Sequence, residues 1–170
     1  MFANLLAAAI GKTWYLPFEK DLILWLQSLG GKGCFLYYLM NGISAMGETY
    51  VIAAVIILLY WGIDKTVGEK VAFTMFSATL LTPMIKNVVC RTRPFDSIEE
   101  VNNFRNVGGY SFPSGHSSTS ASTYGCVAWN YRSKKHIWLS VVGIALPLLV
   151  ALSRMYLGAH FFTDVAVGLA

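Results

Sequence analysis

The chain has 170 residues, of which 55% are hydrophobic and 13% are charged, with a net charge of +4 and a mean hydropathy of +0.53. Soluble domains carry about 25% charged residues, so this composition excludes an ordinary soluble domain and indicates a single-domain membrane protein. The basic residues form no stripe with interleaved aromatic residues, which argues against nucleic acid as a partner.

The residues before 47 do not form a clean membrane span. The apolar run 22–29 is short and is followed by the glycine-rich segment 30–33, and the next run, 35–46, contains Asn41 and Gly42. We expect interfacial or re-entrant helices over 1–46, ahead of a transmembrane core over 47–170. Residues 1–10 lack a charged start, so a cleaved signal peptide is not expected.

Five apolar runs follow, and each is interpreted as a membrane-spanning helix. They are 49–62, 71–89, 116–131, 137–152 and 161–170. A full crossing takes about 20 residues at a rise of about 1.5 Å per residue, so the last run is too short. The predicted fold is therefore an all-α, polytopic transmembrane helix bundle of about five to six spans, with a truncated last helix.

The loops between these runs predict the orientation of the chain. The short loops 64–70 and 132–136 fall on one side of the membrane, and the long segment 90–114 falls on the other. The loop 132–136 reads RSKKH, and such basic loops mark the cytoplasmic side. We therefore expect a multi-pass protein of the cell membrane whose segment 90–114 is extracytoplasmic, although it carries Arg91, Arg93 and Arg105.

Lys86 and Arg93 form the first candidate anion site. They are seven residues apart, so they share a helix face if the helix continues to Arg93 and ends at Pro94. Both side chains can then converge on one anion. The alternative is that both extend to lipid head groups, as cationic side chains near helix ends often do.

Ser114, Gly115 and His116 follow Pro113 at the start of the run 116–131. A helix N-terminus offers unpaired N–H groups to an anion, and glycine lets the backbone approach a phosphate closely. The alternative is ordinary helix capping by Ser114. Capping leaves the imidazole of His116 without an explanation.

His160 and Asp164 are four residues apart at the start of the last run, and Arg154 lies six residues before His160. The spacing places the imidazole and the carboxylate on one helix face. A carboxylate bonded to one ring nitrogen fixes the tautomer and raises the basicity of the other nitrogen. The alternative is a structural histidine–aspartate pair that joins two helices.

Together the patterns K-x6-R-P, P-S-G-H and S-R-x5-H-x3-D, complete from Lys86 to Asp164, resemble those of the type 2 phosphatidic acid phosphatase family, also called lipid phosphate phosphatases. The resemblance implies a membrane enzyme that hydrolyses a lipid phosphate or pyrophosphate without a metal, through a phospho-histidine intermediate. Undecaprenyl pyrophosphate is the leading substrate hypothesis. Phosphatidylglycerol phosphate, phosphatidic acid and lipid A phosphates are the alternatives.

The resemblance also implies a role for each motif residue. His160 is the expected nucleophile, Asp164 orients it, and His116 is the expected general acid that protonates the leaving group. The expected substrate-binding groups are three cations and two residues with backbone amides: Lys86, Arg93, Arg154, Ser114 and Gly115.

No metal or cofactor is predicted. Of the nine acidic residues only Asp164 lies within the motifs, whereas divalent cations prefer convergent oxygen ligands. The cysteines Cys34, Cys90 and Cys126 have no metal-ligand spacing; we expect free thiols, with a Cys34–Cys90 disulfide as the alternative.

Two other classes of function share parts of this pattern. The phosphate pocket also resembles that of vanadium-dependent haloperoxidases, which are soluble, and the apolar runs argue against them. A membrane protein that only binds a lipid head group is the second alternative. The intact set of His116, His160 and Asp164 favours catalysis. The oligomeric state is not predicted.

Overall fold

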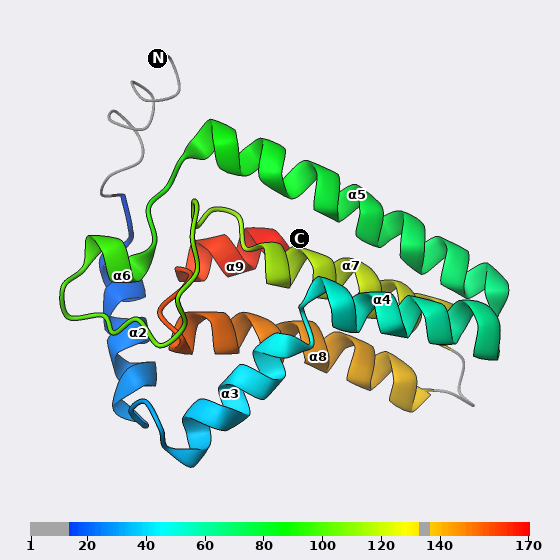
Figure 1. The fold of residues 1–170 in the computed structure, drawn as a ribbon, viewed down its shortest axis with the longest axis horizontal. Coiled ribbons are helices and arrows are strands. Elements are labelled where there is room, and N and C mark those ends of the chain that lie inside the picture. Colours follow the sequence, from blue (N-terminus) through cyan, green and yellow to red (C-terminus); the bar gives the residue numbers. More distant parts are fainter. Residues whose placement is uncertain (1–13, 133–136) are drawn as a thin grey trace.

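The structure is a computed structural model that describes residues 14–132 and 137–170 (Figure 1). Over these residues every regular element is a helix, which confirms the all-α fold. Residues 1–10 and the basic positions 133–136, which entered the signal-peptide and orientation predictions, lie outside the described residues. The elements in chain order are α2 (Pro17–Ser28), α3 (Phe35–Ala45), α4 (Thr49–Leu58), a π-helical turn (Leu59–Ile63), α5 (Lys65–Val89), α6 (Pro94–Ser97), α7 (Gly115–Asn130), α8 (Ile137–Tyr156) and α9 (Phe162–Leu169).

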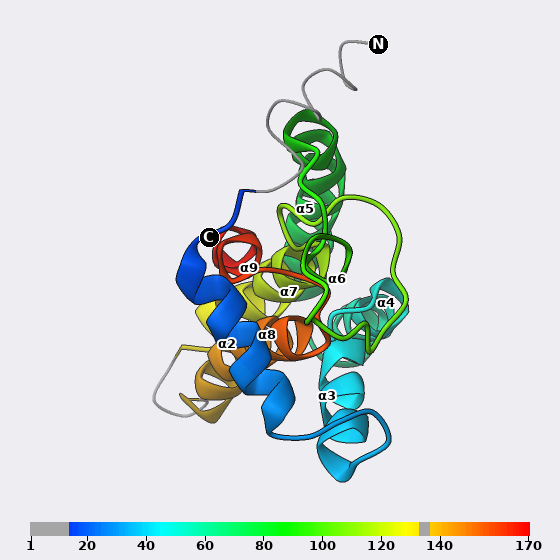
Figure 2. The same ribbon diagram turned by 90° about the vertical axis from the view of Figure 1, so that its left-hand side faces the viewer.

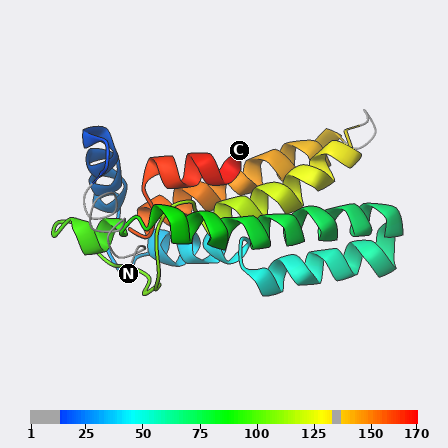
Figure 3. The same ribbon diagram turned by 90° about the horizontal axis from the view of Figure 1, so that it is seen from above.

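The helix α7 lies at the centre of the bundle and packs against α8, α5 and α9. These helices and α4 run roughly along the long axis of the molecule, as Figure 3 shows from above. One face of α7 is small and polar and is buried; it includes Ser117, Ser120 and Thr123. Small side chains let helices approach closely in a membrane.

The helix α2 crosses the end of this bundle and contacts α8 (Figure 2). Ile23 and Leu26 on its inner face join a core that includes Tyr156, Leu157 and Phe161. The helix α2 is thus packed onto the end of the bundle where α8 ends and α9 begins. The predicted division into 1–46 and 47–170 stays a prediction.

The helix α5 runs without interruption through Pro83 and ends at Val89. Cys90 follows in the left-handed conformation, with φ 53°, so the helix does not reach Arg93. The prediction of a helix that continues to Arg93 and ends at Pro94 is therefore wrong. Pro94 instead begins α6, because proline fits the first helical position and forces the residue before it into an extended conformation.

The helices α3 and α4 meet at a bend of 55°. By length and composition, two described segments can cross a membrane: Lys65–Ser97, which contains α5 and α6, and Ile137–Tyr156. Phe35–Ala45 together with Thr49–Ile63 is a third candidate if the bent pair is one span. The predicted five to six spans also counted the shorter runs 116–131 and 161–170, whose helices are below this length.

Candidate active site

His160 lies in the link between α8 and α9, and the two helix ends around it carry the other residues of its motif. Arg154 is in the last turn of α8, and Asp164 is in the first turn of α9. Gly158 makes the turn between them with φ 74°, and a side chain there would lie 2.5 Å from the carbonyl of Asn102. Only glycine fits both the conformation and the space.

Ser114 is the N-cap of α7, as the capping alternative predicted. Its Oγ accepts hydrogen bonds from the backbone N–H and the hydroxyl of Ser117, at 3.4 and 3.0 Å. Its own backbone N–H donates to the backbone carbonyl of Asp164 at 2.9 Å, which ties the start of α7 to α9. A side chain at Gly115 would touch only Thr82, at 3.8 Å, so no described protein neighbour requires glycine there.

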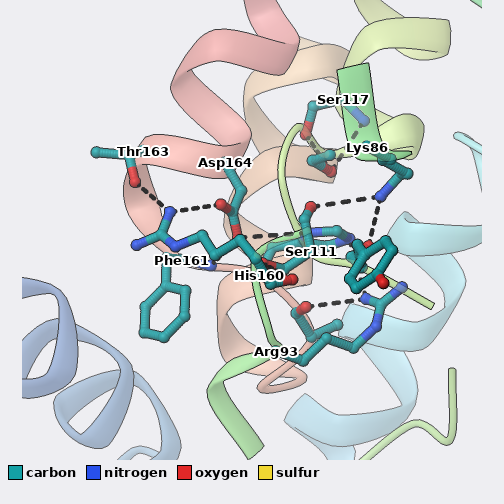
Figure 4. Close-up of polar contacts among 12 residues, drawn as sticks. Lys86, Arg93, Ser111, Ser117, His160, Phe161, Thr163 and Asp164 are labelled. Atoms are coloured by element: carbon teal, nitrogen blue, oxygen red, sulfur yellow. Dashed lines mark hydrogen bonds and ion pairs between the residues drawn. The ribbon is translucent and has the colours of Figure 1, made fainter. Parts of the chain in front are cut away.

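Lys86 points inward to the loop before α7. Its Nζ donates to the backbone carbonyls of Tyr110, at 2.7 Å, and Ser111, at 3.4 Å (Figure 4). The half-buried ammonium group therefore does not extend to lipid head groups.

Arg93 reaches the same loop and also the nucleophile candidate. Its Nε and NH2 donate to the carbonyls of Gly109 and Gly108, at 2.9 and 2.8 Å, and its NH1 donates to the carbonyl of Ala159 at 3.0 Å. The same NH1 lies 3.4 Å from Nε2 of His160. Lys86 and Arg93 thus converge although no single helix carries both.

His160 is 2% exposed, and its two ring nitrogens face different groups. Nε2 faces Arg93, whereas Nδ1 lies 3.6 Å from Oδ2 of Asp164, which is longer than a hydrogen bond. Burial, and then the positive charges of Arg154 and Arg93, lower the pKa of His160 well below its usual value. The imidazole is therefore neutral at pH 7, the form in which it can act as a nucleophile.

Arg154 and His116 complete the set from α8 and α7. The NH1 of Arg154 donates to the hydroxyl of Ser44 at 2.9 Å, and its buried Nε has no hydrogen-bond partner among the described residues. The Nε2 of His116 lies 3.1 Å from Oε1 of Glu48, without the angles of a good hydrogen bond. A cavity of about 210 Å³ borders Lys86, Gly115 and His116.

The three sequence motifs therefore meet at one place. Arg154, Arg93, Lys86 and His116 all lie near enough to His160 to act electrostatically on its ring. They come from α8, the link after α5, α5 itself and α7.

The chain is also similar to known proteins. The family model described as the PAP2 superfamily matches residues 69–170, more than half of the chain. The chain belongs to the PAP2 superfamily. It is 30% identical over 140 residues to the phosphatidylglycerophosphatase B of Bacillus subtilis, covering 76% of this chain and 66% of that protein. It is 30% identical over 132 residues to the undecaprenyl-diphosphatase of Sulfolobus acidocaldarius, covering 76% and 62%. The chain thus spans slightly less than two thirds of these relatives.

Two solved PAP2-type structures are similar in fold. The crystal structure of the transmembrane PAP2 type phosphatidylglycerolphosphate phosphatase from Bacillus subtilis has a TM-score of 0.73 and 25% sequence identity, covering 99% of this chain and 85% of that one. The Aquifex aeolicus LpxE has a TM-score of 0.79 and 21% identity, covering 93% and 90%, and shows the fold alone. With the apolar helices, these similarities indicate a membrane location for this PAP2 member.

Two charged residues that contact the PAP2 motif residue Asp164 or its partner, Arg91 and Glu19, were assigned no role in the site from the sequence. Arg91 is 1% exposed and bridges Oδ1 of Asp164, at 2.5 Å, and Oε2 of Glu19, at 3.1 Å. Its NH1 also donates to the hydroxyl of Thr163 at 2.6 Å. Arg91 occupies a variable position of K-x6-R-P, and Glu19 follows Pro17 in a pattern typical of a helix start, so neither carried a specific signal.

The sequence analysis gave no role in the site to three residues near His116. Glu48 directly precedes the apolar run 49–62, and Ser44 lies within the run 35–46, so neither stood out from its neighbours. Arg105 was noted only as a basic residue of the long loop. In the structure Ser44 accepts from NH1 of Arg105, and Glu48 pairs with NH2 of the same guanidinium. The contacts join segments about 60 residues apart, which no local pattern reveals.

The described residues contain no group of three histidine, cysteine, aspartate or glutamate side chains that could hold a metal ion. Cys34, Cys90 and Cys126 are free, so the alternative of a Cys34–Cys90 disulfide is wrong. Arg154, Arg93 and Lys86 provide positive charge around His160.

Proposed function

We propose that this chain is a membrane phosphatase that hydrolyses a lipid phosphate or pyrophosphate through a phospho-histidine intermediate at His160. The observation that carries the proposal is the position of the His160 ring: it is buried and neutral, and its Nε2 lies 3.4 Å from Arg93 among further cations. A neutral imidazole nitrogen that faces several cations suits attack on an anionic phosphoryl group. Membership of the PAP2 superfamily supports the same reaction class.

The first step forms the phospho-enzyme. With its proton on Nδ1, on the side of Asp164, the His160 ring presents the lone pair of Nε2 to phosphorus. The new P–N bond forms as the bond from phosphorus to the leaving oxygen breaks. His116 gives its proton to that oxygen, so the product leaves as an alcohol or as a lipid monophosphate.

The second step releases phosphate. Water attacks phosphorus from the side that the leaving group vacated, and His116 accepts the proton that the water loses. The P–N bond breaks, and its electron pair returns to Nε2 of His160. Phosphate leaves and both histidines regain their starting protonation.

Charge stabilisation is the main contribution that the protein makes to such a reaction. Lys86, Arg93 and Arg154 would bind the phosphoryl oxygens, with the backbone amides of Ser114 and Gly115 at the α7 N-terminus. In the free protein these cations are held by backbone carbonyls and by Ser44. A phosphate oxygen would replace those neutral acceptors with a charged one, which forms a stronger hydrogen bond.

The proposed protein is multi-pass, and its site opens on the extracytoplasmic side. The orientation rests on the basic loop 132–136, at the opposite end of α8 from Arg154. A site at the ends of spanning helices suits a lipid whose phosphate lies at the membrane surface. Undecaprenyl pyrophosphate is the leading substrate, supported by similarity to an undecaprenyl-diphosphatase; phosphatidylglycerol phosphate is the second candidate, from the similar phosphatidylglycerophosphatase B.

The test is phosphate release by the purified protein in detergent, with a chelator present, from undecaprenyl pyrophosphate, phosphatidylglycerol phosphate and phosphatidic acid. We expect turnover without added metal and a loss of about 10³-fold or more in kcat for His160→Ala. With a ³²P-labelled substrate, the quenched wild type should carry an acid-labile label that His160→Ala lacks.

Glu100→Gln is the matched control, because Glu100 is an exposed carboxylate paired with Lys20. It should retain the wild-type rate. Equal rates for wild type and His160→Ala would remove His160 as the nucleophile. Binding of lipid phosphates without any phosphate release would replace the enzyme by a lipid-binding protein.

A further inference from the structure

The joint between α3 and α4, residues 44–48, is packed tightly against the first turns of α7. A side chain at Gly47 would lie 3.0 Å from both Cβ and the carbonyl oxygen of His116, so a larger residue would push the start of α7 away by a few tenths of an ångström. The carbonyls of Met46 and Gly47 accept hydrogen bonds from the hydroxyls of Tyr124, at 2.8 Å, and Thr119, at 3.1 Å. The position of this joint relative to His116 is therefore set by backbone contacts.

The joint presents Glu48 to the imidazole. Oε1 of Glu48 lies 3.1 Å from Nε2 of His116 and also pairs with NH2 of Arg105. Ser44, one helical turn earlier, accepts from both Arg105 and Arg154, at 3.1 and 2.9 Å. The carboxylate is thus held between one histidine and one arginine by a network that reaches the phosphate-binding cations.

Helix capping does not account for Glu48. It occupies the N-cap position of α4, but its side chain makes no capping hydrogen bond. The carboxylate is 22% exposed and borders the same cavity as Lys86 and His116. Its polar contacts go to the site and not to its own helix.

The charges around His116 give Glu48 a chemical task. The groups that act on the imidazole are Arg154 from α8, Arg105 from the long loop, and Glu48; His160 and Lys86 lie across the site. Among these groups Glu48 is the acidic one, and the cations oppose protonation of the ring. A general acid must nevertheless hold a proton before the leaving group departs.

We propose that Glu48 is a positioning residue that favours the protonated form of His116 and orients the ring for proton transfer to the leaving oxygen. The proposal rests on the proposed phosphatase function. The carboxylate lies 3.1 Å from Nε2 and balances the imidazolium charge on that side of the ring, which leaves the proton on Nδ1 for transfer. In the second step the same carboxylate stabilises His116 when it takes the proton from water.

The experiment compares Glu48→Gln with wild type in the dependence of kcat on pH. Glutamine keeps the size of the side chain and removes its charge. Because an opposite charge at this distance favours the protonated ring by about 1 to 3 pH units, the alkaline limb of the profile should move to lower pH by about one unit or more. At pH 7 kcat should fall about tenfold or more while KM changes less than about twofold, since the phosphate-binding cations remain.

The ring signals of His116, followed by NMR across the same pH range in both proteins, measure the effect without turnover. The titration in Glu48→Gln should shift in the same direction as the alkaline limb. Glu100→Gln should leave both readouts at their wild-type positions. An inactive wild type would defeat the proposed function, while the titration would still show whether Glu48 stabilises the imidazolium.

A folded Glu48→Gln protein whose alkaline limb and His116 titration match wild type would overturn the proposal. Glu48→Asp keeps the charge at a shorter reach and covers the case in which the glutamine variant does not fold. The alkaline limb of Glu48→Asp should stay within about half a pH unit of wild type, because the carboxylate still favours the imidazolium. Its kcat should fall, because the shorter side chain positions His116 less well. A limb displaced as far as about one unit in the aspartate variant would also contradict the proposal.

Discussion

Each histidine of the site faces a carboxylate, and the two carboxylates have opposite surroundings. Asp164 belongs to an inner cluster with Glu19, Arg91 and Thr163, in which the ionic side chains are at most 1% exposed. Glu48 belongs to an outer cluster with Ser44, Arg105 and His116, which borders the cavity and is about a quarter exposed at its charged groups. The inner cluster suits rigid positioning, and the outer cluster suits proton exchange.

The inner cluster leaves few hydrogen-bonding positions unused. Glu19 accepts from the backbone N–H and the hydroxyl of Thr163, both at 2.8 Å, and Asp164 accepts from the backbone N–H of Phe161 at 2.8 Å. The Arg91 guanidinium lies over the rings of Trp14 and Phe161, at 3.9 and 4.2 Å. Buried charges are tolerated only when paired in this way, so the cluster ties α2 and the segment after α5 to the first turn of α9.

The largest expected effect comes from Arg91→Met. The substitution leaves the carboxylates of Glu19 and Asp164 buried and unpaired, and removing one partner of a buried ion pair costs about 3–5 kcal/mol. We expect the free energy of unfolding in detergent to fall by about that amount, with loss of activity as α9 is released. Denaturant unfolding followed by tryptophan fluorescence measures the change.

Arg132→Met is the matched control for Arg91→Met. Arg132 is exposed and also lies over an aromatic ring, that of Trp129, but among the described residues it forms no ion pair with a carboxylate. The same chemical change there should leave unfolding unaltered. Equal stability of the two variants would show that the inner cluster is not needed for the fold.

A smaller effect is expected from Glu19→Gln. Glutamine retains an oxygen for Thr163, and Arg91 keeps its bridge to Asp164, so one charge partner is lost and most hydrogen bonds remain. We expect a loss of about 1–3 kcal/mol in stability, with kcat of the folded protein unchanged. The measurements are unfolding in detergent and phosphate release.

Glu100→Gln makes the same change on an exposed glutamate and should alter neither stability nor rate. If Glu19→Gln lowered kcat and left unfolding unchanged, the inner cluster would act on the chemistry and not on the scaffold.

The difference between the clusters also explains what the sequence could predict. Lys86, His116 and His160 belong to three motifs that together resemble those of a known family, so they could be grouped from the sequence. Glu19 joins the inner cluster through Arg91, which is 72 residues away, and Glu48 joins the outer cluster through His116, which is 68 residues away. Nothing in the local sequence of either glutamate distinguishes it from a capping or flanking residue. The predicted end of α5 was wrong because the seven-residue spacing from Lys86 to Arg93 gives no sign of the left-handed conformation at Cys90, which ends the helix.

The spans were also harder to predict than the all-α class. Composition alone indicates helices in lipid, because such helices satisfy every backbone hydrogen bond internally. The 55° joint between α3 and α4 packs through Gly47 against His116, a contact between distant segments. Local hydropathy therefore recovered the apolar runs but not the bent arrangement that carries Glu48.

The smallest and most specific effect is expected from Arg105→Gln in the outer cluster. Arg105 and His116 share Oε1 of Glu48, so removing the guanidinium leaves the carboxylate to the imidazole and also removes a cation that opposes its protonation. The alkaline limb of kcat should then move to higher pH, opposite in sign to Glu48→Gln, by a fraction of a unit because Arg105 is partly exposed. A rate–pH profile in low and high salt measures the shift, which should shrink as salt increases.

The double variant Glu48→Gln/Arg105→Gln tests whether Glu48 mediates this shift. Relative to Glu48→Gln, its alkaline limb should move to higher pH by less than Arg105→Gln moves the limb relative to wild type, since the carboxylate that mediates part of the shift is gone. A downward shift for Arg105→Gln would mean that the arginine holds Glu48 in place for His116 and does not compete for it.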